Sequence, residues 1–321
     1  MYSFSHAAKC EAAKINLADD LENIAELSAV IHAGGSVSLG KEMKIEISTE
    51  IEPLYSRINL ILKRLYNSYA ELYTDDDLSI NKHIRYIITI LPEIAKEVLF
   101  DCELLRISQT GNTEFVSGIE NMLIIEESAA RAYVRGVFLA CSTSSITLND
   151  VHFSEHSGYH MEFLFTNETL ADDFAQLLTR FEIFAKKIVR KGSYVVYLKD
   201  AQSISDVLAL VGVNDAVLSF NEQVMMREVK NNINRQNNCI NYNMNKTVNA
   251  AVEQAEAIKV IDSLVGLSSL PLELSKLAKL RLEMPDATLS ELAEVMDGKL
   301  SKSGIRHRFN KIITIAKNLL N

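Results

Sequence analysis

The sequence predicts a mixed α+β domain built from two related halves, followed by an all-helical C-terminal domain. Three observations lead to this prediction: two helices with regularly spaced small residues, a similar strand and helix order after each of them, and a helical C-terminal segment rich in positive charge. With 321 residues, the chain is long enough for two domains. We place the first domain at residues 1–221, with repeats at about 22–110 and 128–221. A linker and connecting helix follow at 222–265, and the last domain occupies 266–321.

Two predicted helices carry a small residue at every fourth position. The small residues are Ala25, Ala29 and Ala33 in the first helix, and Ala132, Gly136 and Ala140 in the second. Residues four apart lie on one face of a helix, so each helix has a flat side that another backbone can approach closely. Because both helices carry the pattern, we expect their flat sides to pack against each other. Packing of each helix beneath its own sheet is the alternative.

The segments that follow the two helices also match each other. Residues 44–66 align with residues 160–182 at an offset of 116, and both predict a strand followed by an amphipathic helix. The segments that begin at Arg85 and Ser193 each predict another strand and helix, and the second copy has a longer hairpin near residues 149–159. Two copies are too few for a solenoid, so we predict one pseudo-twofold domain.

The stretches LSAVIHAGGS at 27–36 and VRGVFLACST at 134–143 resemble the two LAGLIDADG motifs of homing endonucleases. The resemblance implies that the two helices pack side by side, that saddle-shaped sheets lie over DNA, and that an acidic residue ending each helix binds the catalytic magnesium. The corresponding positions here are Gly34 and Cys141, and no Asp or Glu lies within 27–41 or 128–149. Gly and Cys cannot supply hard oxygen ligands, so we predict this fold without catalytic residues, metal or other cofactor.

The C-terminal segment predicts three helices. Pro271 favours a helix start, and Thr288 with Glu291 three residues later has the pattern of a capping box. A final helix begins near Ser301 or Ser303. Its apolar positions share one face at helical spacing and are Ile305, Phe309, Ile312 and Ala316. A capped helix, a short connection and a second helix with a polar outer face are typical of a helix-turn-helix.

Positive charge is concentrated in this final segment. The chain has a net charge of −9, yet residues 298–321 contain six basic and no acidic residues, which leaves −15 for residues 1–297. A local basic face is typical of phosphate binding. We predict contacts to double-stranded DNA from Thr288, Lys299, Ser301, Lys302, Ser303, Arg306, His307, Arg308, Asn310, Lys311 and Thr314. Arg, Asn and Ser can read base edges and Lys can hold phosphates, whereas a merely solubilising basic helix is the alternative.

The segment LRLEMPDATLSELAEVM…LSKSGIRHRFNKI, placed after the repeat domain, resembles the WhiA family of bacterial transcription regulators. Residues 245–261 resemble the connecting helix of that family, and YSFSHAAKCE resembles its start. Cys141-Ser142-Thr143 replaces the Gly-Gly-Ser usual in the family. The resemblance implies DNA binding and a role in sporulation or, in non-sporulating bacteria, in cell division and chromosome segregation. A transcription factor or a component of RNA polymerase is a further candidate partner.

Three further features of the sequence are an Asn-rich stretch, a group of histidines and a cysteine beside two hydroxyl residues. Ten Asn residues within 221–249 predict a linker with partial helix, joined to a helix at 247–264. A zinc site is conceivable at His152, His156 and His160, although exposed hairpin histidines are the commoner case. Cys141 beside Ser142 and Thr143 suggests a nucleophile, but no His or Asp can be placed next to it from the sequence.

Cysteine usage and hydropathy indicate the compartment. Four scattered cysteines, no long apolar segment and no signal-peptide core predict a cytoplasmic protein at the nucleoid without a membrane partner. Two classes of function stay open: a non-enzymatic DNA-binding regulator, and a nuclease that uses unrecognised carboxylates. A third, weaker interpretation is a protein-binding module that its C-terminal helices anchor to DNA.

Overall fold

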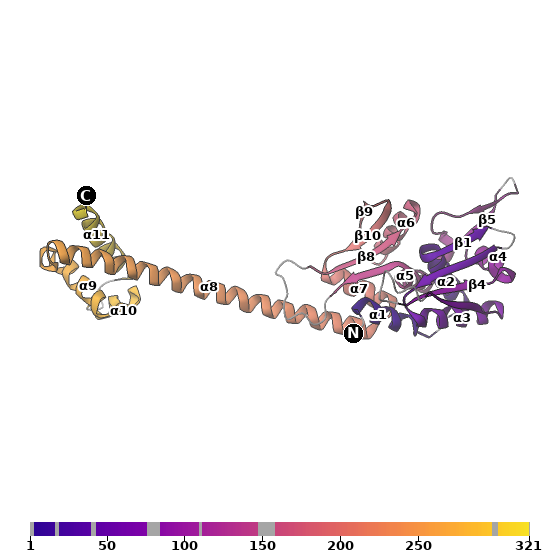
Figure 1. The fold of residues 1–321 in the computed structure, drawn as a ribbon, viewed down its shortest axis with the longest axis horizontal. Coiled ribbons are helices and arrows are strands. Elements are labelled where there is room, and N and C mark those ends of the chain that lie inside the picture. The colour runs from indigo at the N-terminus through magenta and orange to yellow at the C-terminus, as the bar shows by residue number, and fades with distance from the viewer. Residues whose placement is uncertain are drawn as a thin grey trace. The chain divides into compact units, whose positions relative to one another are not determined.

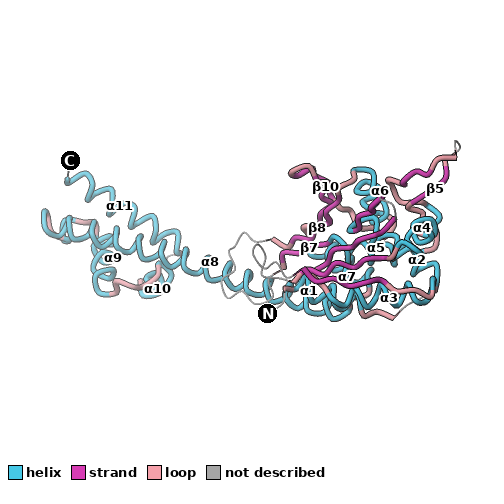
Figure 2. Tube along the Cα trace, turned by 45° about the vertical axis from the view of Figure 1, so that its right-hand side comes forward, coloured by secondary structure: helices cyan, strands magenta, loops and turns pink. Residues whose placement is uncertain are grey.

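The computed structural model describes residues 3–16, 19–39, 43–75, 84–108, 111–146, 158–296 and 301–320. The chain folds into two compact units, Met1–Met226 and Arg227–Asn321. Figure 1 gives the order of the elements, and Figure 2 shows that the strands belong to the first unit, whereas the described part of the second is helical. The predicted mixed α+β class is confirmed.

The first unit contains two repeats with the same order of elements. The first repeat consists of α2 (Asp20–Gly34), β1 (Gly35–Leu39), β2 (Met43–Thr49), α3 (Glu52–Tyr66), β3 (Ala70–Asp75), β4 (Arg85–Ile90) and α4 (Pro92–Asp101). The second consists of α5 (Glu127–Cys141), β7 (Ser142–Ser145), β8 (His160–Phe165), α6 (Glu168–Thr179), β9 (Lys186–Arg190), β10 (Ser193–Leu198) and α7 (Ala201–Val211). Helix α1 (Phe4–Ala13) precedes them, and β5 (Leu105–Ile107), β6 (Thr113–Phe115) and the short helix η1 (Asn121–Ile124) connect them.

Each repeat folds its four strands into an antiparallel sheet. The strand orders are β1-β2-β4-β3 and β7-β8-β10-β9, so the two sheets have the same topology. The register is also repeated, because Ile47 pairs with Ile88 in the first sheet and Phe163 pairs with Val196 in the second. All four side chains are buried. Alternate residues of a strand point to one face, so each sheet contributes one apolar face to the core.

Helices α2 and α5 lie against each other in the middle of this unit. A Cβ atom added to Gly136 would lie 2.4 Å from the backbone oxygen of Glu26 and 2.6 Å from the Cβ of Ala29. At the other end of the contact, a Cβ on Gly34 would lie 3.0 Å from the Cβ of Ala140. The two backbones therefore approach each other more closely than larger side chains permit.

A buried ion-pair cluster joins three helices beside this contact. Glu26 on α2 is 1% exposed, and its carboxylate accepts hydrogen bonds from Arg57 on α3 and from Arg135 on α5. Arg57 Nη2 and Arg135 Nε each lie 2.7 Å from Glu26 Oε2. Arg57 also donates to the carbonyl oxygens of Ala13 and Ile15. Buried charges are tolerated when they are paired and hydrogen-bonded in this way.

The expectation of a partly helical Asn-rich linker is wrong, because α8 is one continuous helix over Asn214–Leu264. Within the first unit, its start is held by the buried Phe220 and by the Glu11 carboxylate, which accepts hydrogen bonds from two backbone amides. Within the second unit, Ile258 and Ile261 are buried. Extending a helix that packing has already nucleated at both ends costs far less than starting one, so the weak helix propensity of Asn does not interrupt it.

The second unit packs three further helices on the end of α8. These helices are α9 (Leu272–Glu283), α10 (Leu289–Val295) and α11 (Lys302–Leu320), and the short helix η2 (Leu267–Ser269) leads into them. Their apolar faces share one hydrophobic core with α8. None of the helices in the described ranges is long and apolar enough to cross a membrane.

Replacing Gly136 by Leu is expected to destabilise the first unit, because the new side chain would force the α2 and α5 backbones apart. Overpacking of this kind costs about 1 to 3 kcal/mol. Ala29→Leu is expected to act similarly, and the double variant to be non-additive, since both side chains compete for the same space. Urea unfolding measures the three effects, with Gly158→Leu as the control, because a Cβ there meets nothing within 4 Å. Additive effects would contradict a direct contact.

Removing the negative charge of Glu26 is expected to leave two buried guanidinium groups without their counter-charge. Glu26→Gln should therefore lower the free energy of unfolding by about 3 to 5 kcal/mol, the usual effect of breaking a buried pair. The matched control is Glu127→Gln, which removes an exposed pair with Arg131 at 2.7 Å and should cost at most about 0.5 kcal/mol. Equal effects of the two substitutions in urea unfolding would show that the cluster adds no stability.

Candidate nucleic-acid interface

Helix α11 separates an apolar from a polar face along its length. Ile305, Phe309, Ile312 and Ala316 are buried in the core of the second unit, which confirms the predicted apolar face. The exposed residues of the predicted DNA-binding set on or next to this helix are Ser301, Lys302, Ser303, Arg306, His307, Asn310, Lys311 and Thr314. The core therefore fixes the helix in rotation and leaves one polar face open to solvent.

Hydroxyl side chains cap the N-termini of α10 and α11, the two helices of the predicted helix-turn-helix. Thr288 Oγ1 accepts a hydrogen bond from the Glu291 amide at 3.3 Å, and the Glu291 carboxylate accepts one from the Thr288 amide at 2.6 Å. These bonds hold the pKa of Glu291 below its usual value, and the predicted capping box is confirmed. Ser301 Oγ accepts from the Gly304 amide at 3.3 Å. Thr288 and Ser301 thus cap the N-termini of these two helices.

Buried Arg281 holds the connection between α9 and α10, and the sequence analysis missed it. Its Nη1 donates to the backbone oxygen of Ala287 at 2.6 Å, and its Nε donates to Gln254 Oε1 on α8 at 3.1 Å. The guanidinium also lies over the Phe309 ring, 5.2 Å from its centroid, and burial lowers the pKa of Arg281. Its spacing of four residues from the buried Leu277 is the sequence signal that would have identified an inward position.

The arginines of α11 differ in their surroundings. Arg308 Nη2 lies 3.4 Å from Glu273 Oε2 on α9, and its side chain is 24% exposed. Arg308, one of the predicted DNA contacts, is thus only partly exposed, and its guanidinium pairs with a carboxylate of α9. Lys302, Arg306 and Lys311, in contrast, form no ion pair with any residue that the structure describes. Lys299 lies outside the described residues.

Neither α2 nor α5, both fully within the described ranges, ends in a residue with a carboxylate. Gly34 and Cys141 end these helices, and burial raises the pKa of the Cys141 thiol to about 12, so the thiol is protonated and a poor nucleophile at neutral pH. Burial also lowers the pKa of His32 to about 4. Within the described ranges, no three His, Cys, Asp or Glu side chains are placed to hold a metal ion. His152 and His156 lie outside those ranges.

The outer faces of the two sheets carry acidic residues at matching positions. Glu46 on β2 pairs with Lys44 at 2.7 Å, and Glu162 on β8 pairs with Arg190 at 2.7 Å. Each carboxylate thus neutralises a neighbouring cation of its sheet. The cations of α11 named above have no such partner in the described part of the chain.

Three family models match successive parts of the chain. The WhiA N-terminal LAGLIDADG-like domain matches residues 20–105, the WhiA LAGLIDADG-like domain matches residues 130–230, and the WhiA C-terminal HTH domain matches residues 233–316. The predicted order of a LAGLIDADG-like domain before a helix-turn-helix domain is therefore confirmed.

Similar proteins match over nearly the whole chain. The relative from Shouchella clausii, named "Probable cell division protein WhiA", is 36% identical over 322 residues, covering 99% of this chain and 95% of its own length. The relative of the same name from Staphylococcus aureus strain JH9 is 34% identical over 321 residues, covering 99% and 98%. The crystal structure of full-length DUF199/WhiA from Thermatoga maritima matches with a TM-score of 0.59 at 23% identity over 99% of both chains. This agreement in domain order, length and fold shows that the chain belongs to the WhiA family.

Proposed function

We propose that this protein is a non-enzymatic, sequence-specific DNA-binding protein that regulates transcription. The observation that carries the proposal is the exposed polar face of α11, on which Lys302, Arg306 and Lys311 have no counter-charge among the described residues. The opposite face is fixed in the core by Ile305 and Phe309. A helix held in this way can enter the major groove with its polar face toward the bases.

The polar face divides into two kinds of contact. His307 and Asn310 are exposed and can reach base edges, and an Asn side chain can form two hydrogen bonds with adenine. Lys302, Arg306 and Lys311 are placed to hold phosphates, which positions the helix without reading sequence. We assign Arg308 a supporting role, because its ion pair with Glu273 links α11 to α9.

The relatives indicate where such a regulator acts. Their printed name is that of a probable cell division protein, and we extend this role to the present chain, together with chromosome segregation or sporulation. Binding to chromosomal DNA places the protein at the nucleoid. The first unit is the candidate surface for a transcription factor or a component of RNA polymerase, because residues 1–297, which include it, carry a net charge of −15 and suit protein contacts better than phosphates.

The proposal predicts separable effects of two α11 substitutions. Arg306→Ala is expected to weaken binding to specific and scrambled duplexes alike and to reduce the slope of log affinity against log salt by about one unit. Asn310→Ala is expected to lower the discrimination at one base pair by about 1 to 3 kcal/mol and to leave the salt slope unchanged. Salt titrations with both duplexes measure these effects.

The control for this experiment is Lys96→Ala, which removes an exposed lysine from α4 in the first unit and should change neither duplex affinity nor salt slope. If both α11 variants bind the two duplexes as the unmodified protein does, the helix does not enter the groove. An effect of Lys96→Ala equal to that of Arg306→Ala would instead indicate a diffuse response to net charge.

The non-enzymatic part of the proposal rests on the helix ends at Gly34 and Cys141. These two residues lack the oxygen ligands with which the acidic helix ends of homing endonucleases would hold magnesium. We expect supercoiled plasmid to remain uncut after incubation with the full-length protein and Mg²⁺ or Mn²⁺, as judged by gel electrophoresis. Metal-dependent, site-specific nicking that persists through repurification would contradict the assignment.

A further inference from the structure

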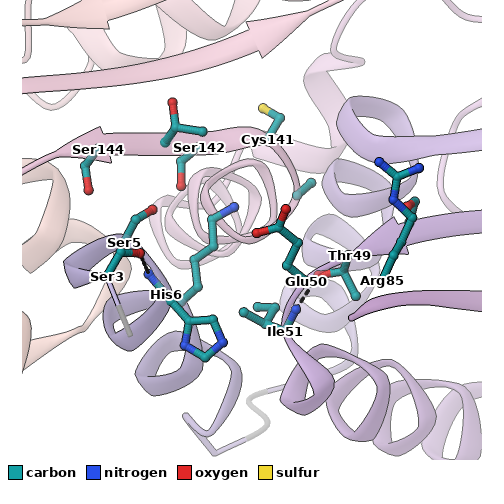
Figure 3. A pocket seen from close by; sticks show the side chains of 14 residues that line it. Ser3, Ser5, His6, Thr49, Glu50, Ile51, Arg85, Cys141, Ser142 and Ser144 are labelled. Carbon is teal, nitrogen blue, oxygen red and sulfur yellow. Dashed lines mark hydrogen bonds between the residues drawn. The ribbon is translucent and has the colours of Figure 1, made fainter. Parts of the chain in front are cut away.

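A polar cavity of about 420 Å³ lies within the first unit (Figure 3). It is bounded by the start of α1, by the turn between β2 and α3, and by the end of α5 with the start of β7. Fourteen residues line it, of which seven are Ser or Thr. The volume falls in the range of small-molecule sites, but the hydroxyl-rich lining indicates a ligand with many hydrogen-bonding groups.

The lining has an excess of positive charge. It includes Lys9 and Arg85 against a single carboxylate, that of Glu50. Neither Lys9 nor Arg85 forms a hydrogen bond or ion pair within the described part of the chain. Burial lowers the pKa of Lys9, and the nearby carboxylate of Glu50 offsets this in part. An anion placed beside the ammonium would favour its charged form.

The N-terminus of helix α1 lies at the cavity. Ser3 caps α1, whose first turn contains no acidic residue, and Ser3, Ser5 and His6 line the cavity. The first amides of a helix attract anions, because their N–H groups lack intrahelical partners and the helix dipole is positive there. Lys9 follows on the same helix, whereas Figure 3 shows Arg85 on the opposite side of Glu50 from Ser3 and Ser5.

The carboxylate of Glu50 adds a negatively charged hydrogen-bond acceptor to the cavity lining. Figure 3 shows its carboxylate facing the same space as the hydroxyl groups of Ser5 and Ser142. A carboxylate repels a ligand that consists only of negatively charged groups, but it accepts hydrogen bonds from the hydroxyl groups of a sugar. Together with Arg85 and the Ser and Thr side chains, it can bind a ring rich in hydroxyl groups while Lys9 and the first amides of α1 bind a phosphate.

We propose that this cavity binds a small phosphorylated sugar. The phosphate lies at Lys9 and the first turn of α1, and the sugar hydroxyls lie at Glu50, Arg85 and the surrounding Ser and Thr side chains. The carboxylate favours a free sugar phosphate over a phosphate of the DNA backbone, because it repels a backbone of repeated negative charges. This site belongs to the first unit and is independent of the α11 surface.

Isothermal titration calorimetry on the full-length protein tests the proposal, with ribose 5-phosphate as the probe and with ribose and inorganic phosphate for comparison. Saturable binding of ribose 5-phosphate is expected, with no binding of ribose and weaker binding of phosphate. Lys9→Met and Arg85→Gln should each weaken the affinity by about tenfold, the loss expected for one charge-assisted hydrogen bond. Lys96→Met, on α4, is the matched control and should bind normally. Arg85 is exposed, so its substitution tests the site even if Lys9→Met impairs folding.

Three results would overturn the proposal: no saturable binding of ribose 5-phosphate, equal binding by the unmodified protein and both site variants, or equal binding of ribose. Duplex DNA separates the two sources of phosphate. Lys9→Met and Arg85→Gln should leave duplex affinity unchanged, and a loss would assign the cavity to the DNA backbone. Arg306→Ala should not alter ribose 5-phosphate binding, so a failure here is distinguishable from a failure of the DNA-binding proposal.

Discussion

The close approach of α2 and α5 is the constraint on which the first unit depends. The absence of a side chain at Gly136 lets this helix lie against the Glu26 backbone and the Ala29 methyl group. This close contact fixes the position of the two repeats relative to each other. The sheets of the two repeats have the same strand order. The close contact also brings Glu26 between Arg57 and Arg135, where the charges compensate one another out of water.

The α2 and α5 pair combines close helix packing with helix ends that carry no acidic residue. Gly34 and Cys141 end the two helices where the resemblance to homing endonucleases places metal-binding acids. The buried carboxylate of the pair, Glu26, lies further inside α2 and is occupied by two arginines. The carboxylate therefore stabilises the interface, and the polar lining beside Cys141 has the composition of a binding cavity.

In the second unit, position relative to the core decides what each arginine does. Arg281 points inward and holds the connection between two helices through backbone carbonyl oxygens. Arg308 lies at the edge of the core and pairs with Glu273. Arg306, two residues earlier on the same helix, faces solvent. Because a helix turns by 100° per residue, neighbouring arginines meet different surroundings, and a basic stretch is not uniformly a nucleic-acid surface.

Features that depend on local spacing could be predicted from the amino-acid sequence: the small-residue faces of α2 and α5, the repeated order of elements, the Thr288 capping box and the apolar face of α11. The Glu26 cluster, the inward position of Arg281, the pairing of Arg308 and the continuity of α8 became visible only in the three-dimensional fold. Each of these requires contacts between residues far apart in the chain or packing at both ends of a helix. Periodicity reports which face of an element is apolar, but it does not report which charged group will meet that face.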